Sequence, residues 1–137
     1  MNGFKECKII IPIAPVTKKN SQRILINPRS GRPFVAPSIK FKEYQENARP
    51  FVCQFGLYGG EYPVNIKCLF YMPTRRRVDL TNLLESVDDV LTHYGIITDD
   101  SSNYIGGHDG SRVFYDKDKP RTEIFIYPLK LEETREQ

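Results

Sequence analysis

Apolar positions along the chain follow two different spacings, and each spacing predicts a different kind of element. In residues 80–94, apolar side chains recur every three or four positions, which is the spacing of one face of an α-helix. Gly95 is suited to end this helix, because glycine adopts the left-handed conformation common at helix ends. Residues 64–72 begin with alternating apolar and polar positions, which predicts a half-buried β-strand.

Two shorter strand patterns precede these elements. β-Branched residues within 4–14 predict a first strand, which Pro12 stops. Residues 24–36 predict a hairpin, because Asn27, Pro28 and Gly31 have turn chemistry and lie between two short apolar runs.

A second helix is predicted after Pro37. Ser38 is a candidate N-cap, because a serine hydroxyl accepts a hydrogen bond from the free N–H groups of a first helical turn. Apolar residues follow at helical spacing, and Pro50 weakens the pattern near its end. These apolar positions are Phe41, Tyr44, Ala48 and Phe51.

The C-terminal part of the chain predicts short extended segments and turns. Residues 96–98 are expected to be extended, and the glycine-rich residues 106–110 to form a turn. Residues 112–115 and 122–127 are expected to pair as a hairpin around 116–120.

Together these elements predict one α+β domain over residues 1–130, with a frayed tail at 131–137. Its sheet is expected to be mixed and mostly antiparallel, with two main helices. The length of 137 residues suits one compact domain.

Charge is distributed unevenly along the sequence. The formal net charge is only +3, but most charged residues between Lys5 and Arg77 are basic, while Glu132, Glu133 and Glu136 make the end acidic. A basic half of this kind indicates a surface for a polyanion more strongly than the total does.

The cysteines and the hydropathy pattern indicate the environment of the protein. Cys7, Cys53 and Cys68 are odd in number and widely spaced, so we expect buried free thiols in a reducing cytoplasm rather than disulfides or a zinc site. No apolar run approaches the roughly 18 residues of a membrane span, so no membrane partner is expected.

A run of arginines leads directly into an acidic residue at the start of the predicted 80–94 helix. Arg75, Arg76 and Arg77 suit phosphate groups, whereas Asp79 is either the N-cap of the helix or a ligand for a hard cation such as Mg²⁺ or Mn²⁺. Asp99-Asp100 follows the turn at Gly95. The chain is then long enough to return toward the helix start, so Asp79 and Asp100 could share a metal site.

Alternatives to these roles stay open. Asp99-Asp100 also suits a solvated turn. Asn82 and Asp89 lie on the polar face of the helix, where they could support a metal or simply face solvent, and solvent is expected for Asp88. We expect His93 to favour the helix C-terminus as a cation, and His108 to be exposed in its glycine-rich turn.

A second basic tract covers the predicted hairpin and both of its flanks. Its interruption by Asn, Ser and Gln suits contacts with a nucleic-acid backbone, although a flexible solvated loop is nearly as well supported. The tract consists of Lys18, Lys19, Asn20, Arg23, Arg29, Arg32 and Lys40.

At these residues the sequence resembles the RusA family of Holliday junction resolvases, which are often carried by phages and prophages. The resemblance covers most of the chain. It depends on the order of an arginine cluster, Asp79-Leu80-Thr81-Asn82, a helix with an internal Asp89, Gly95, and Asp99-Asp100. Residues 15–20 with Arg23, and Gly31-Arg32-Pro33-Phe34-Val35, also match.

The resemblance implies Mg²⁺- or Mn²⁺-dependent cleavage of four-way DNA junctions by a homodimer, with paired nicks, in recombination and repair. The essential carboxylates of the family fall on Asp79 and Asp100, with Asp99, Asp89 and Asn82 in supporting roles. A third acidic residue of the family falls on Thr81, which offers a hydroxyl but no charge. The family's DNA contacts fall on Lys18, Lys19, Asn20 and Arg23, with Arg75, Arg76 and Arg77 as further candidates to hold phosphates.

Three other functions remain compatible with the sequence. A non-catalytic DNA-binding module would bind junctions without cutting them, and Thr81 would then indicate a lost active site. A structural protein would use the basic tract for an acidic partner. A nuclease for flaps or other branches would differ only in its substrate.

Overall fold

A long central strand, β4 (Val64–Met72), organises the main sheet of the protein. The structure is a computed structural model that describes residues 6–18, 23–36, 38–56 and 58–129. The main sheet has five strands in the order β1-β7-β4-β5, and β6 pairs with β4 on the same side as β5. The other strands are β1 (Cys7–Ile11), β5 (Ile105–Gly107), β6 (Arg112–Tyr115) and β7 (Arg121–Pro128).

The sheet is mixed, as the sequence predicts. β7 pairs antiparallel with both β1 and β4, whereas β5 and β6 run parallel to β4. On one side of β7, Ile126 pairs with Ile66 of β4. On the other side of β7, Ile124 pairs with Ile9 of β1. Alternate residues of these strands are therefore buried on one face of the sheet.

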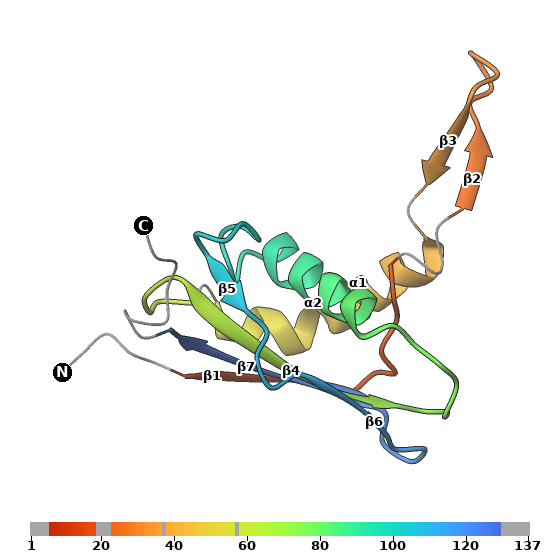
Figure 1. The fold of residues 1–137 in the computed structure, drawn as a ribbon. Helices are drawn as coiled ribbons and strands as arrows, with labels where there is room; N and C mark the ends of the chain where they lie inside the picture. The colour runs from red at the N-terminus through yellow and green to blue at the C-terminus, as the bar shows by residue number, and fades with distance from the viewer. Residues whose placement is uncertain (1–5, 19–22, 37, 57, 130–137) are drawn as a thin grey trace.

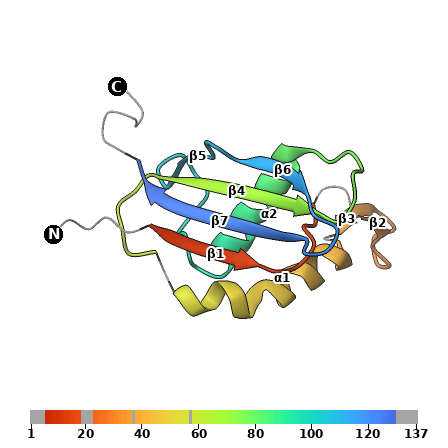
Figure 2. The same ribbon diagram turned by 90° about the horizontal axis from the view of Figure 1, so that it is seen from below.

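Two helices cover that face, α1 (Ile39–Val52) and α2 (Leu80–His93), and the opposite face is left open (Figures 1 and 2). The short η2 (Cys53–Phe55) follows α1. The predicted Ser38 cap is confirmed, because the backbone N–H of Phe41 donates to the Ser38 hydroxyl at 3.1 Å. The apolar stripe of α2 is also confirmed, since its members are buried: Leu83, Val87, Val90 and Leu91.

The predicted hairpin forms a separate two-stranded sheet of β2 (Arg23–Ile26) and β3 (Pro33–Ala36). It extends away from the main sheet and its helices (Figure 1). Lys19 and Asn20, which precede it, and the predicted tail at 131–137 lie outside the described residues.

The predicted C-terminal hairpin is wrong in its pairing, although both of its strands exist. β6 and β7 pair with opposite sides of β4 and so do not pair with each other. The long, apolar β4 gains backbone hydrogen bonds on both sides in this arrangement, which a simple hairpin would not provide.

Two smaller predictions in this region also need correction. Residues 96–98 form bends, and Ile96 and Ile97 are buried in the core because the N–H of Ile96 turns back to bond the Leu91 carbonyl at 2.9 Å. Gly106 and Gly107 belong to β5, and the turn lies after them.

The three cysteines are free, but only one is buried. Cys68 lies in the core, where burial raises the pKa of its thiol, whereas Cys53 is exposed because it follows the end of α1 at the surface. The expectation of buried thiols is therefore wrong for Cys53.

Across the part of the chain that the structure describes, none of the helices has the length and apolar character needed to cross a membrane.

Candidate functional site

Asp79 occupies the N-cap position of α2, but its carboxylate does not cap the helix. Its backbone is extended and its carbonyl accepts the N–H of Leu83 at 3.1 Å, while no helix N–H bonds to its side chain. The carboxylate instead accepts the Thr81 hydroxyl at 3.3 Å and the Asn82 amide at 3.5 Å, and the residue is exposed. Because these contacts are long, the carboxylate keeps capacity for another partner.

A pocket of about 300 Å³ opens beside the first turns of α2, and we call it the carboxylate pocket. It brings Asp100 next to the helix start, since Thr81 of the first turn lines the same pocket. The backbone reverses at Gly95, whose φ is +75°, and this reversal directs the chain back along the helix. The lining residues are Thr81, Leu84, Glu85, Asp88, Asp100 and His108.

Asp88 and His108 form the inner wall of the carboxylate pocket. His108 Nε2 lies 3.0 Å from Asp88 Oδ1 and 2.9 Å from Asp88 Oδ2. The Asp88 side chain is only 15% exposed and the His108 side chain only 27% exposed. The predictions of a solvated Asp88 and an exposed His108 are therefore wrong. The reason is the crossover from β4 through α2 to β5, which places the turn after β5 against the helix.

The spacing of polar residues along α2 could have placed Asp88 in this pocket. Thr81, Glu85 and Asp88 are spaced by four and three positions, so they lie on one side of α2. The partner His108 has no such signal, because it comes from another element.

Asp99 is engaged locally. Its Oδ1 accepts the N–H of Asp100 at 2.7 Å, and both residues are exposed. This contact supports the turn that presents Asp100, and Asp99 does not line the carboxylate pocket.

Asp89 faces a different neighbour from Asp100. Its Oδ2 lies 3.5 Å from the ammonium of Lys18, and the N–H of Lys18 donates to the Ser86 hydroxyl at 2.9 Å. Ser86 is buried, and its hydroxyl accepts this bond from the N-terminal segment. Asp89 therefore lies outside the carboxylate pocket and holds that segment on α2.

A second hollow, of about 370 Å³, lies between the N-terminal segment and the loop before α2, and we call it the basic groove. Arg76, Arg77 and Lys40 line it, so cations from two parts of the chain meet there. Within the described ranges, no carboxylate forms an ion pair with Arg75, Arg76 or Arg77. The other lining residues are Pro15, Val16, Thr17, Met72, Pro73, Thr74 and Val78.

The arginines of this loop do not act as one group. The guanidinium of Arg75 lies 4.1 Å from the centre of the Tyr115 ring on β6, which is a cation–π contact, and Arg75 does not line the groove. Arg23, another predicted contact residue, begins β2.

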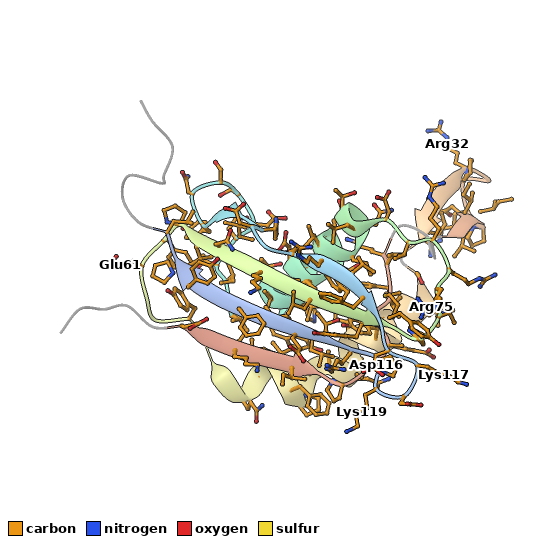
Figure 3. All side chains as sticks on the ribbon, turned by 60° about the horizontal axis from the view of Figure 1, so that its bottom comes forward. Arg32, Glu61, Arg75, Asp116, Lys117 and Lys119 are labelled. Carbon is orange, nitrogen blue, oxygen red and sulfur yellow. The ribbon has the colours of Figure 1, made fainter. Side chains whose placement is uncertain are left out.

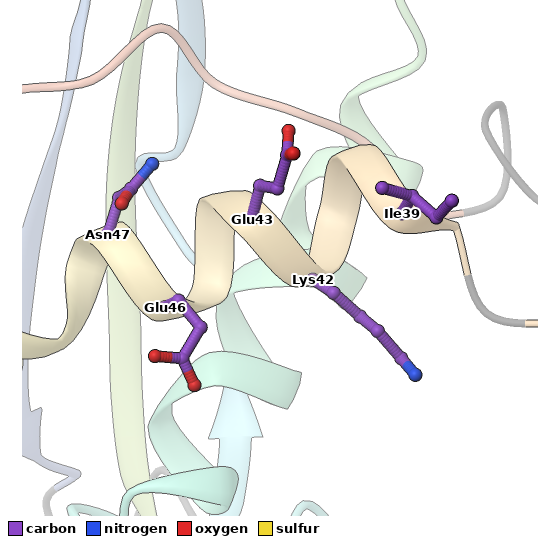
Figure 4. Close-up of a pocket in the computed structure, with 5 residues that line it drawn as sticks. All are labelled: Ile39, Lys42, Glu43, Glu46 and Asn47. Atoms are coloured by element: carbon purple, nitrogen blue, oxygen red, sulfur yellow. The ribbon is translucent and has the colours of Figure 1, made fainter.

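A further hollow lies on α1. All five of its lining residues come from that helix, and Figure 4 shows them along its surface. They are Ile39, Lys42, Glu43, Glu46 and Asn47. This hollow contains none of the predicted site residues.

The carboxylates fit a hard cation in their chemistry. Asp79 and Asp100 offer oxygen ligands, which Mg²⁺ and Mn²⁺ prefer. Among the residues that can be placed, no three His, Cys, Asp or Glu side chains are positioned to share a metal. Mg²⁺ does not need such a cage, because it is commonly held by one or two carboxylates together with water and substrate phosphates.

Comparisons with known proteins add no assignment. No protein-family model matches the sequence, and no curated protein matches it.

Proposed function

We propose that the protein is a metal-dependent endonuclease for branched DNA, of the RusA type, which resolves four-way junctions in recombination and repair. The observation that carries this proposal is the placement of Asp79. Its carboxylate is exposed and does not cap the helix. Asp79 follows Val78, which lines the basic groove, and precedes Thr81, which lines the carboxylate pocket. One residue therefore lies between the cations of the groove and the carboxylates of the pocket.

In this proposal Asp79 and Asp100 hold Mg²⁺ or Mn²⁺, and Thr81 orients the Asp79 carboxylate through its hydroxyl. When bound, the metal would activate a water molecule and stabilise the charge that develops on the phosphate. Arg76, Arg77 and Lys40 hold the DNA backbone in the basic groove. Asp99 supports the turn at Asp100, and Asn82 contacts the Asp79 carboxylate.

A homodimer follows from the substrate in this proposal. A four-way junction has two-fold symmetry, and two copies of the chain would place one site on each of two opposed strands. Paired nicks require both sites, and this activity places the protein in the cytoplasm with the DNA.

The test is cleavage of a synthetic four-way junction and of a matched linear duplex, with Mg²⁺, with Mn²⁺ and with chelator. We expect paired nicks near the branch point that require metal and are lost in Asp100→Asn. Asp118→Asn is the matched control, because Asp118 is an exposed carboxylate between β6 and β7 that lines neither the carboxylate pocket nor the basic groove, and it should retain most of the cleavage. Undiminished cutting by Asp100→Asn, or cutting in chelator, would contradict the proposal.

A second candidate is a non-catalytic module that binds branched DNA. Thr81 in place of a carboxylate favours it, as does the absence of a three-ligand cluster among the residues described. This candidate predicts tight junction binding without nicks under any metal condition. In that case Thr81→Asp is the substitution expected to restore cleavage.

A further inference from the structure

The β2–β3 hairpin has almost no support from the rest of the protein. Its two strands form their own sheet, and the hairpin projects away from the helices and the main sheet (Figure 1). Figure 3 shows Arg32 at its outer end, away from the other labelled side chains. An isolated two-stranded hairpin is only marginally stable in water, so a partner that packs against it would stabilise it.

Its exposed side chains are unusually apolar. Ile24 is 75% exposed, Ile26 is 68% exposed and Phe34 is 46% exposed. In the register, Leu25 lies opposite Phe34 and Ile24 opposite Val35, so large apolar residues occur on both faces of the ribbon. Exposed apolar surface of this kind, on a segment with little core of its own, marks a contact site.

The charge of the hairpin and its flanking segments favours a polyanion as the partner. No Asp or Glu occurs from Cys7 to Lys42, although this part of the sequence holds eight lysines and arginines: Lys8, Lys18, Lys19, Arg23, Arg29, Arg32, Lys40 and Lys42. A protein partner would need an acidic surface matched to the hairpin, whereas DNA offers phosphates along its whole length.

The turn at the tip is built to present its arginines. The Asn27 side chain accepts the N–H of Arg29 at 2.8 Å and that of Ser30 at 3.3 Å, and the Asn27 carbonyl accepts the N–H of Gly31 at 2.8 Å. Gly31 has a φ of +72°, which L side chains rarely adopt. Arg29 and Arg32 are both exposed on this fixed turn.

The basic groove is lined by described residues from both flanks of the hairpin. Thr17 lines the groove on the N-terminal side of the hairpin, and Lys40 lines it on the C-terminal side. A DNA strand held in the groove would therefore continue toward the hairpin. A two-stranded β-ribbon has dimensions that fit a groove of duplex DNA.

From shape, charge and position together, we propose that the β2–β3 hairpin is an arm that enters a groove of duplex DNA beside the cleavage site. Arg29 and Arg32 contact phosphates, and Ile24, Ile26 and Phe34 pack on sugars and base edges, as apolar side chains of groove-binding proteins do. This inference rests on the proposed function, because it takes DNA as the ligand.

The test is binding of a fluorescent four-way junction in chelator, where no cleavage is needed, at several salt concentrations. We expect Arg29→Ala with Arg32→Ala to weaken binding about tenfold and to lower the salt dependence by about two phosphate contacts. Ile24→Ser with Ile26→Ser should weaken binding with an unchanged salt slope. The matched control is Lys117→Ala with Lys119→Ala, which removes two exposed cations from the loop between β6 and β7 and should change binding less than about twofold.

Separate outcomes distinguish the arm from the enzyme. If the wild type binds and cuts DNA but the double variant of Arg29 and Arg32 binds like the lysine control, the proposed role of the arm is overturned and the proposed nuclease activity is retained. If binding depends on the arm but no cutting occurs, the nuclease fails and the arm stands. A wild type that binds no DNA overturns both. Sedimentation of the arm variants adds one check, because a change in oligomeric state would overturn the arm in favour of a second copy as its occupant.

Discussion

Arginines and carboxylates are neighbours in two loops of this protein, and the two loops use them in opposite ways. At the start of β7, Arg121 donates to Glu123 at 2.8 Å and to Asp116 of the preceding loop at 2.9 Å, and its guanidinium lies 3.8 Å from the centre of the Tyr71 ring. Before α2, Arg76 and Arg77 precede Asp79 along the chain, yet none of them forms an ion pair with a residue that the structure places.

The difference teaches which charges are available to a ligand. The hydrogen bonds that Arg121 donates to Glu123 and Asp116 raise the pKa of Arg121, and those that Asp116 accepts from the Lys119 N–H and from Arg121 lower the pKa of Asp116. Those charges are satisfied within the protein. The charges around Asp79 are not, so a phosphate or a cation can still gain from them.

The largest effect should come from Asp79→Asn. Cleavage of the junction should fall by about 100-fold or more, because a metal ligand is lost, while binding is kept or tightened since a charge that repels DNA is removed. Asp116→Asn, the matched change in the satisfied loop, should cut normally. Equal losses in the two variants, measured as single-turnover rates, would contradict the distinction between the loops.

Next in size is the effect of Arg76→Ala combined with Arg77→Ala. We expect junction affinity to fall about tenfold and the salt slope to fall by about two, because two phosphate contacts disappear. The midpoint of thermal unfolding should not move. Fluorescence anisotropy and a thermal melt check both parts, and unchanged affinity would exclude the basic groove as the DNA site.

Arg121→Ala should have the reverse profile. Its ion pairs and its ring contact are lost, so the midpoint of thermal unfolding should fall by about 3–5 °C, a modest amount because the cluster is partly solvated. DNA affinity should stay within error. Arg112→Ala on β6 is the control, since Arg112 forms no ion pair among the residues described. An equal shift of the unfolding midpoint in both variants would contradict a stabilising role for the ion pairs of Arg121.

The smallest effect concerns pH. The pKa of Asp116 is lower in the folded protein than its usual value of about 4, so its carboxylate stabilises the fold above that value and this contribution disappears as the pH falls through the folded pKa. Asp116→Asn should therefore melt about 1–3 °C below the wild type at neutral pH. The two proteins should converge once the pH is below the folded pKa of Asp116, and a difference that persists there would point to another cause.

Local features of the fold could be predicted from the sequence, because local spacing and turn chemistry determine them. The limits of β4, the apolar stripe of α2, the Ser38 cap and the hairpin at 24–36 all agree with the structure. The approach of Asp100 to the helix start could also be predicted, since it follows from helix length and the reversal at Gly95.

Contacts between distant segments could not be predicted in this way. The strands β6 and β7 were expected to pair because they are adjacent in sequence, but β4 competes for both with a longer apolar edge. Asp88 and His108 lie 20 positions apart and meet only because the crossover stacks their elements. The separation of Arg75 from Arg76 and Arg77 could not be predicted either, because its contact with Tyr115 joins two distant segments of the chain.

The pairing of β1 with β7 has a consequence for synthesis of the protein on the ribosome. β1 is at the edge of the main sheet, and its register partners are residues 122–126 near the other end of the chain. At about 5–20 residues per second, the first strand waits on the order of ten seconds for β7, its strand partner within the described residues. During that interval Ile9 and Ile11 lack their strand partner, so the nascent chain cannot complete its sheet until β7 has left the exit tunnel. A chain stalled before β7 would therefore lose two strands from the sheet rather than one.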